Sequence, residues 1–231
     1  MSEPENVSPP PRIVVEANGP YRVEGNVRII RTAVVKTERG EPVAWEDGPE
    51  FKRKKTATLC RCGRSSNKPY CDSTHEQWAF DGTEVADRGP IADRRAAYEG
   101  EGVVLYDDLS ICTRHGFCKT VSRGVWDMIS DPDPAIREQA KAMTARCPSG
   151  RIAYAIPPDP ETVEAEVEPT IGIEPNASIV VRGGIPVVSE DGTPYEVRAR
   201  QALCRCGHSG NKPFCDGSHA THLFHDRAMP S

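Results

Sequence analysis

The chain has 231 residues, enough for one large domain or two to three small ones, and 37% of them are apolar. Its formal net charge of -5 gives no electrostatic case for binding nucleic acid or an anionic membrane surface. No apolar run approaches a transmembrane length and the first residues lack the features of a signal peptide, so we expect a cytoplasmic protein with no membrane partner.

The chain begins with a stretch rich in proline and serine, and residues 1–11 are predicted to form a disordered tail. Short β-favouring runs follow, separated by Asn-Gly and Gly-Asn turn pairs. This pattern is typical of a meander of antiparallel strands. We expect strands at residues 13–16, 21–23, 27–30 and 33–36.

The first candidate ligand motif reads C-x-C-x8-C-x3-H, at Cys60, Cys62, Cys71 and His75. Residues two apart in an extended segment point to the same side, and residues four apart in a helical turn share a face. The motif therefore offers two convergent pairs of ligands. Three thiolates and one imidazole suit either a tetrahedral zinc ion or a [2Fe-2S] cluster, which needs two ligands on each iron. The spacing by itself leaves both cofactors open.

The middle segment, residues 100–160, is organised differently. We expect strands at residues 103–106 and 152–156 and a helix that begins at Pro134. Candidate cofactor ligands stand at the connections between these elements: Cys112, His115, Cys118 and Cys147. The alternative is that the three thiols are ordinary reduced cysteines and the histidine is a surface residue.

The last part of the chain, residues 161–231, repeats the first. The stretch IEPN at residues 173–176 matches VEAN at residues 15–18, with equal spacing to a following glycine. The ligand motif returns with identical spacing at Cys204, Cys206, Cys215 and His219. Strands are expected at residues 179–181, 185–188 and 195–197. Six of the nine cysteines lie in the two motifs, so metal ligation accounts for them better than disulfides do.

From Cys204 to His219 the chain reads C-x-C-x2-S-x3-P-x-C-D-G-S-H, which resembles the CDGSH (mitoNEET-like) family of iron-sulfur proteins. The first copy differs at Ser73, which replaces the glycine. If that position needs a positive φ, serine there costs about 1 kcal/mol. The resemblance implies that each [2Fe-2S] cluster has one iron on the C-x-C cysteines and the other on the third cysteine and the histidine.

The resemblance also implies an architecture. CDGSH proteins with one motif are typically homodimers whose strands join, so two copies in one chain imply an intrachain pseudo-dimer, and hence a monomer with an internal twofold. The predicted fold class is α+β. Two small β-rich halves, at residues 12–99 and 161–231, flank an inserted ferredoxin-like α+β domain at residues 100–160.

A Cys-Pro pair downstream of closely spaced cysteines is typical of bacterial-type ferredoxins. The middle segment resembles the divergent single-cluster ferredoxins, in which a histidine takes the second ligand position. This resemblance implies a third cluster. Three cysteines suffice for [3Fe-4S], whereas [4Fe-4S] needs His115 or an external ligand.

These sites predict an iron-sulfur protein that acts in electron transfer, cluster transfer or redox sensing, rather than an enzyme. The sequence has no Gly-rich nucleotide loop, nucleophile arrangement or carboxylate pair that would indicate catalysis. The expected partner is a redox protein or an apo protein that accepts a cluster, and a basic run at residues 52–55 is a weak indication of an acidic one. The alternative is a zinc-stabilised interaction module without redox activity.

Overall fold

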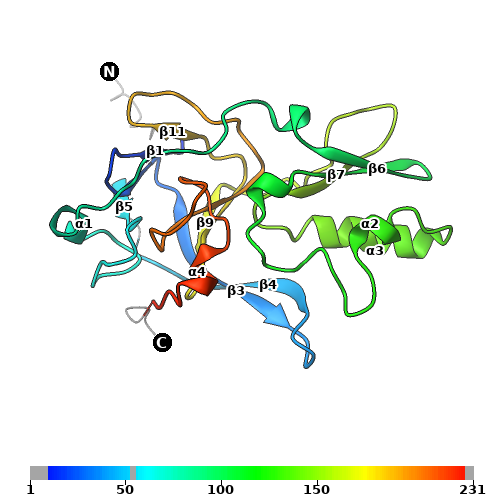
Figure 1. The fold of residues 1–231 in the computed structure, drawn as a ribbon, viewed down its shortest axis with the longest axis horizontal. Helices are drawn as coiled ribbons and strands as arrows, with labels where there is room; N and C mark the ends of the chain where they lie inside the picture. The colour runs from blue at the N-terminus through cyan, green and yellow to red at the C-terminus, as the bar shows by residue number, and fades with distance from the viewer. Residues whose placement is uncertain (1–9, 53–55, 227–231) are drawn as a thin grey trace, which may run out of the picture.

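The computed structural model describes residues 10–52 and 56–226. The tail predicted at residues 1–11 lies largely outside these residues, as does most of the basic run at residues 52–55. Figure 1 shows a β-rich body from which the middle segment, coloured green, projects to one side. Within the described residues, no helix combines the length and apolar character needed to cross a membrane.

Strands dominate the described part of the first half. They are β1 (Arg12–Val15), β2 (Tyr21–Glu24), β3 (Arg28–Lys36), β4 (Pro42–Glu50) and β5 (Thr56–Leu59). The strands predicted at residues 27–30 and 33–36 form one strand, β3, because Arg31 and Thr32 between them are not turn residues and take part in strand pairing. Strand β4 was not predicted, because its prolines and Gly48 are residues that are unfavourable in strands.

The second half has its own set of strands: β9 (Thr170–Ile173), β10 (Ile179–Arg182), β11 (Val187–Ser189) and β12 (Arg200–Leu203). The strand predicted at residues 195–197 is wrong, because this stretch is irregular. Tyr195 there packs its ring edge-on against Phe214, with the ring centroids 5.0 Å apart. Strand β12 ends just before the second C-x-C, as β5 ends just before the first.

The two halves exchange strands. One sheet has the order β11-β1-β2-β5 and the other β12-β10-β9-β3-β4. Strand β11 of the second half pairs in parallel with β1, where Ile13 lies opposite Val187. Strand β3 of the first half pairs in parallel with β9, where Ile29 lies opposite Ile171. These two pairings are repeat counterparts, so the third strand of each half completes the sheet of the other. The predicted fold class, an intrachain pseudo-dimer with an α+β insertion, is confirmed.

Both sheets share one hydrophobic core. It combines buried side chains of the first half with buried side chains of the second, among them Ile13, Val15, Leu59, Ile171, Ile173, Val187 and Leu203. Burying one such side chain contributes about 1.5–3 kcal/mol. Tyr21 joins the halves directly, because its buried hydroxyl lies 2.8 Å from the carbonyl oxygens of Cys204 and Pro213. Each half therefore depends on the other for its core.

The two C-x-C loops meet at the pseudo-twofold axis. A Cβ atom on Gly63 would lie 2.5 Å from the carbonyl oxygen of Cys206, and one on Gly207 would lie 2.7 Å from that of Cys62. Both glycines also have positive φ angles, +78° and +84°. Only glycine combines this backbone conformation with such a close approach of two main chains.

The middle segment forms a separate small unit. Its antiparallel sheet contains β6 (Ala96–Gly100), β7 (Val103–Asp107) and β8 (Ile152–Ala155), and strand β6 crosses the boundary predicted between residues 99 and 100. Helices α2 (Val125–Met128) and α3 (Pro134–Thr144) pack together beside it. Helix α3 begins where predicted, because Asp133 Oδ1 accepts a hydrogen bond from Ala135 N (2.8 Å).

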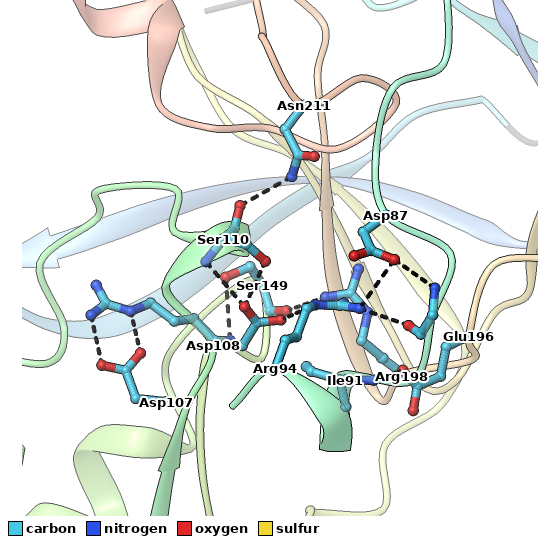
Figure 2. Close-up of polar contacts among 12 residues, drawn as sticks. Asp87, Ile91, Arg94, Asp107, Asp108, Ser110, Ser149, Glu196, Arg198 and Asn211 are labelled. Carbon is cyan, nitrogen blue, oxygen red and sulfur yellow. Dashed lines mark hydrogen bonds and ion pairs between the residues drawn. The ribbon is translucent and has the colours of Figure 1, made fainter. Parts of the chain in front are cut away.

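A polar network attaches this unit to the second half, between the short helices η1 (Ile91–Asp93) and η2 (Leu109–Ile111) (Figure 2). Arg94 Nε donates to Asp108 Oδ2 (2.7 Å), and Asp108 Oδ1 accepts from Ser110 N (3.0 Å). Asn211, in the second ligand loop, donates from Nδ2 to Ser110 O (3.1 Å). Figure 2 shows Asn211 above Ser110, with Asp108 and Arg94 below. The middle cysteines are thereby held beside the second ligand loop.

Candidate metal centres

The first site lies between strand β5 and helix α1 (Thr74–Gln77). Cys60 and Cys62 follow β5 directly, and their sulfur atoms are 3.8 Å apart. Cys71 precedes α1, and its sulfur lies 3.4 Å from His75 Nδ1 within that helix. The strand end and the helix thus present two pairs of ligand atoms.

The second site repeats this arrangement between strand β12 and helix α4 (Ser218–Thr221). The sulfur atoms of Cys204 and Cys206 are 3.7 Å apart, and Cys215 Sγ lies 3.4 Å from His219 Nδ1. In both sites the same ring nitrogen of the histidine faces the cysteine. The structure therefore brings together the pairs that the spacing predicts.

The distances within each pair fit the coordination of one metal ion. Two thiolates bound at about 2.3 Å to one tetrahedral metal lie about 3.8 Å apart, and a thiolate and an imidazole nitrogen about 3.6 Å. The four observed separations, 3.8, 3.4, 3.7 and 3.4 Å, are close to these values. In the part of the chain that the structure describes, no group of three or more His, Cys, Asp or Glu side chains is placed to hold a single ion. At each site the four ligand atoms therefore form two separate pairs.

The C-x-C thiols have pKa values that favour metal binding. A hydrogen bond from Cys62 lowers the pKa of Cys60 to about 6 and raises that of Cys62. The same hydrogen bond between Cys206 and Cys204 lowers the pKa of Cys204 to about 6. In each C-x-C pair the hydrogen bond therefore favours one thiolate, and a thiolate is the form that binds a metal.

The serine and aspartate of the motif hold the ligand loop. In the second copy, Ser209 Oγ donates to Phe214 O (2.6 Å) and Asp216 Oδ2 accepts from Gly210 N (2.8 Å). Asp216 Oδ1 also accepts from Ser218 N (2.9 Å) at the start of α4. The first copy makes the same contacts through Ser65, Tyr70, Ser66, Asp72 and Thr74. The part that this aspartate takes in closing the loop was not predicted from the motif.

The replacement of the motif glycine by Ser73 has a structural explanation. The residue before each short helix has a positive φ, 64° at Ser73 and 87° at Gly217. A Cβ atom on Gly217 would lie 2.9 Å from Arg114 Cδ and 3.1 Å from Thr113 O of the middle segment. Ser73 is exposed instead. Glycine is therefore favoured where the middle segment covers the site, and serine is tolerated where the position is exposed to solvent.

The middle cysteines line one small cavity. Cys112, Cys118 and Cys147 lie around it together with His115 and Arg151. Arg151 Nη1 donates to Cys112 Sγ (3.0 Å), while its Nε donates to Asp107 Oδ1 (2.6 Å). Burial raises the pKa of Cys118, and Arg151 acts against this. The connections thus bring the three thiols to one place beside a fixed guanidinium group.

His115 also lines this cavity, but its ring nitrogens bind other groups. Its Nε2 lies 2.7 Å from Glu174 Oε2, and its Nδ1 lies 2.7 Å from Thr113 Oγ1, so both ring nitrogens are engaged. Its ring centroid is 6.2 Å from that of His219. His115, which was predicted as a candidate ligand of the middle site, therefore lies between the middle segment and the second site. Glu174 had no role in the sequence analysis, although the repeat of Glu16 at this position was a usable signal.

Comparison with known families agrees with this geometry. A family profile described as an iron-binding zinc finger of CDGSH type matches residues 18–76 and again residues 176–220. A second profile, described as a divergent 4Fe-4S mono-cluster, matches residues 98–157. Searches of curated proteins and of solved structures gave no match.

The protein defined by these findings is an iron-sulfur protein. More particularly, the chain carries two CDGSH-type segments that flank one segment of the divergent 4Fe-4S mono-cluster type, as the sequence resemblance indicated.

Proposed function

We propose that the chain binds a [2Fe-2S] cluster at each CDGSH site, through three cysteines and one histidine, and acts in electron transfer or cluster transfer rather than as an enzyme. The observation that carries this proposal is the pairing of ligands in twos, found twice in the chain at separations of 3.4–3.8 Å. When bound, such a cluster supplies one-electron redox chemistry. One iron is assigned to each C-x-C pair and the other to each cysteine-histidine pair.

A third cluster is assigned to the middle site. Cys112, Cys118 and Cys147 are proposed to hold it, since they line one cavity and the matching profile is of the 4Fe-4S type. Three thiols suit a [3Fe-4S] cluster. A [4Fe-4S] cluster would need an external ligand, or His115 released from Thr113 and Glu174.

The two CDGSH sites are proposed to face different partners. His75 lines an open depression with Glu76 and Phe80, and Cys71 is half-buried. At the second site, Cys215 is 2% exposed and the middle segment lies against Gly217. The first site is therefore the proposed contact for a redox protein or an apo cluster acceptor, and the second exchanges electrons with the middle site. The chain is proposed to act as a monomer, because its two halves already complete each other's sheets.

Iron and sulfide quantitation, combined with electron paramagnetic resonance of oxidised and reduced protein, tests the proposal. We expect two [2Fe-2S] centres per chain, with a separate signal from the middle cluster. A colourless protein with stoichiometric zinc and no acid-labile sulfide would contradict the proposal and favour the zinc-stabilised interaction module.

The histidine ligand predicts a specific acid sensitivity. Imidazole binds a metal only when it is neutral, so protons compete with iron as the pH falls. Burial, with a smaller contribution from His115, lowers the pKa of His219, so its ring stays neutral to a lower pH than an exposed imidazole does. We expect the His219→Cys variant to slow the acid-induced loss of visible absorbance from the second cluster at least several-fold.

The matched control is the His75→Cys variant, which should slow loss from the first cluster only. The measurement is the decay of visible absorbance after a drop in pH. Unchanged acid lability of the second cluster in His219→Cys would count against His219 as a ligand.

A further inference from the structure

A buried arginine stands behind each ligand site. Arg61 and Arg205 are the central residues of the two C-x-C motifs, and they are 1% and 2% exposed. Alternate residues of an extended segment point to opposite sides, so these side chains leave the strand away from the sulfurs. A buried cation interacts strongly with nearby charge, because little water screens it.

The two arginines have different partners. Arg205 Nη2 forms an ion pair with Asp226 Oδ2, with side chains 1% and 0% exposed, and Nη1 donates to Glu174 O (3.0 Å). Arg61 donates to two backbone carbonyls, those of Glu16 (3.0 Å) and Gly82. Among the described residues no carboxylate pairs with Arg61, and its Nε has no partner. Arg205 is therefore neutralised and Arg61 is not.

The difference lies at a single repeat position. Gly82 N donates to Asn18 Oδ1 (2.9 Å), and Asp226 N donates to Asn176 Oδ1 (2.7 Å). Asn18 and Asn176 are repeat counterparts, and both Gly82 and Asp226 stand seven residues after their site histidine. Gly82 and Asp226 thus occupy equivalent positions, and the second copy adds a carboxylate there.

We propose that Asp226 gives the two CDGSH sites different reduction potentials, with the potential of the first site higher. This inference rests on the proposed function. Reduction adds one electron, and so one negative charge, to a [2Fe-2S] cluster. The uncompensated cation of Arg61 stabilises that charge at the first site, whereas the carboxylate of Asp226 cancels the field of Arg205 at the second. Arg205 is close enough to act, because it lies between the two ligands Cys204 and Cys206 in the chain and its side chain is buried.

The other charges around the sites do not produce this difference. Several recur in both copies and cancel in the comparison: Glu16 and Glu174, Lys68 and Lys212, Asp72 and Asp216. Arg64, Glu76 and Asp81 belong to the first site only, and Asp81 interacts with Arg61, but all three are exposed, so salt screens them. Arg114 belongs to the second site only and is also exposed, so salt screens it. Among the equivalent positions of the two repeats that the structure describes, the remaining buried difference in charge is Asp226.

The consequence is a direction for electrons inside the chain. A one-electron donor protein reduces the middle or the second site. The electron then passes to the first site, because the reduction potential of the first site is higher. The second centre is oxidised when it loses this electron, and the first centre is reduced when it gains it. The more exposed site is then the one that holds the electron for the acceptor.

Redox titration of the full, cluster-loaded chain tests the inference, with electron paramagnetic resonance as the readout. The His75→Cys variant alters the first signal and so assigns the two centres. In the unaltered protein we expect two potentials, the higher at the first site. Asp226→Asn should raise the potential of the second site toward that of the first, which itself stays unchanged, whereas Asp191→Asn, at an exposed turn, should move neither.

Two further variants keep the test decisive if Asp226→Asn folds poorly. Arg61→Gln should lower the potential of the first site, and the neutral pair Arg205→Gln/Asp226→Asn should leave the second potential as it was. Two signals with one common potential, or a second potential unmoved by Asp226→Asn, would overturn this inference alone. The absence of any [2Fe-2S] signal would overturn the proposed function itself.

Discussion

The Gly63→Ala variant is expected to be destabilised by about 2–6 kcal/mol, which is a large part of the stability of an ordinary domain. The added Cβ atom would lie 2.5 Å from Cys206 O and 2.8 Å from Cys206 C. Both are main-chain atoms of the other half, so no side chain can move aside. The alanine must also adopt a φ of +78°, which adds backbone strain.

Gly102→Ala is the matched control. Gly102 has a similar φ of +69°, but no atom lies within 4 Å of its added Cβ. The control should therefore show the strain alone, about 1–2 kcal/mol. Urea unfolding followed by circular dichroism measures both variants. If Gly63→Ala were no less stable than Gly102→Ala, the close approach of the two ligand loops would be wrong.

The Arg200→Met variant is expected to detach the middle unit from the second half. The guanidinium group of Arg200 donates to Thr144 O (2.5 Å) and Cys147 O (2.8 Å), and it pairs with Glu164 (2.6 Å). Methionine replaces the apolar part of the side chain but leaves these buried acceptors without a donor. Leaving a buried acceptor without its donor costs about 1–3 kcal/mol for each group. Since Cys147 O is one of the acceptors, the middle cluster should be lost before the other two.

Arg12→Met is the control, because Arg12 pairs with Glu24 at the surface and its side chain is 55% exposed. Such a surface pair contributes about 0–1 kcal/mol. Urea unfolding and iron content per chain are the measurements. Retention of the middle cluster signal in Arg200→Met, with a stability equal to that of Arg12→Met, would contradict the role given to Arg200.

The ligand pairs could be predicted from the sequence because they depend on local geometry. Cys60 and Cys62 are two residues apart in extended chain, and Cys71 and His75 are one helical turn apart, so spacing alone brings their ligand atoms together. The start of helix α3 could also be predicted from the sequence, because Asp133 and Pro134 mark it. Family resemblance supplied the pseudo-dimer, which the spacing does not contain.

Features set by distant residues were beyond the sequence analysis. The parallel pairing of β1 with β11 depends on residues more than 170 positions apart, such as Ile13 and Val187, and no local pattern encodes it. The engagement of His115 with Glu174 likewise joins two segments that the sequence separates. Residues 195–197 have the composition of a strand, but the ring of Tyr195 packs on Phe214 in a loop instead. Tertiary contacts decide such cases over local propensity.

The exchange of third strands also sets the order in which the nascent protein can fold. The contacts of the middle unit, between residues 96 and 155, are comparatively local, so we expect it to fold as soon as it leaves the ribosome. The sheet of the first half lacks its edge strand until residues 187–189 have been synthesised. We therefore expect the earliest cysteines of the chain to be among the last to reach their final positions, so that assembly of the first centre waits for nearly the whole polypeptide.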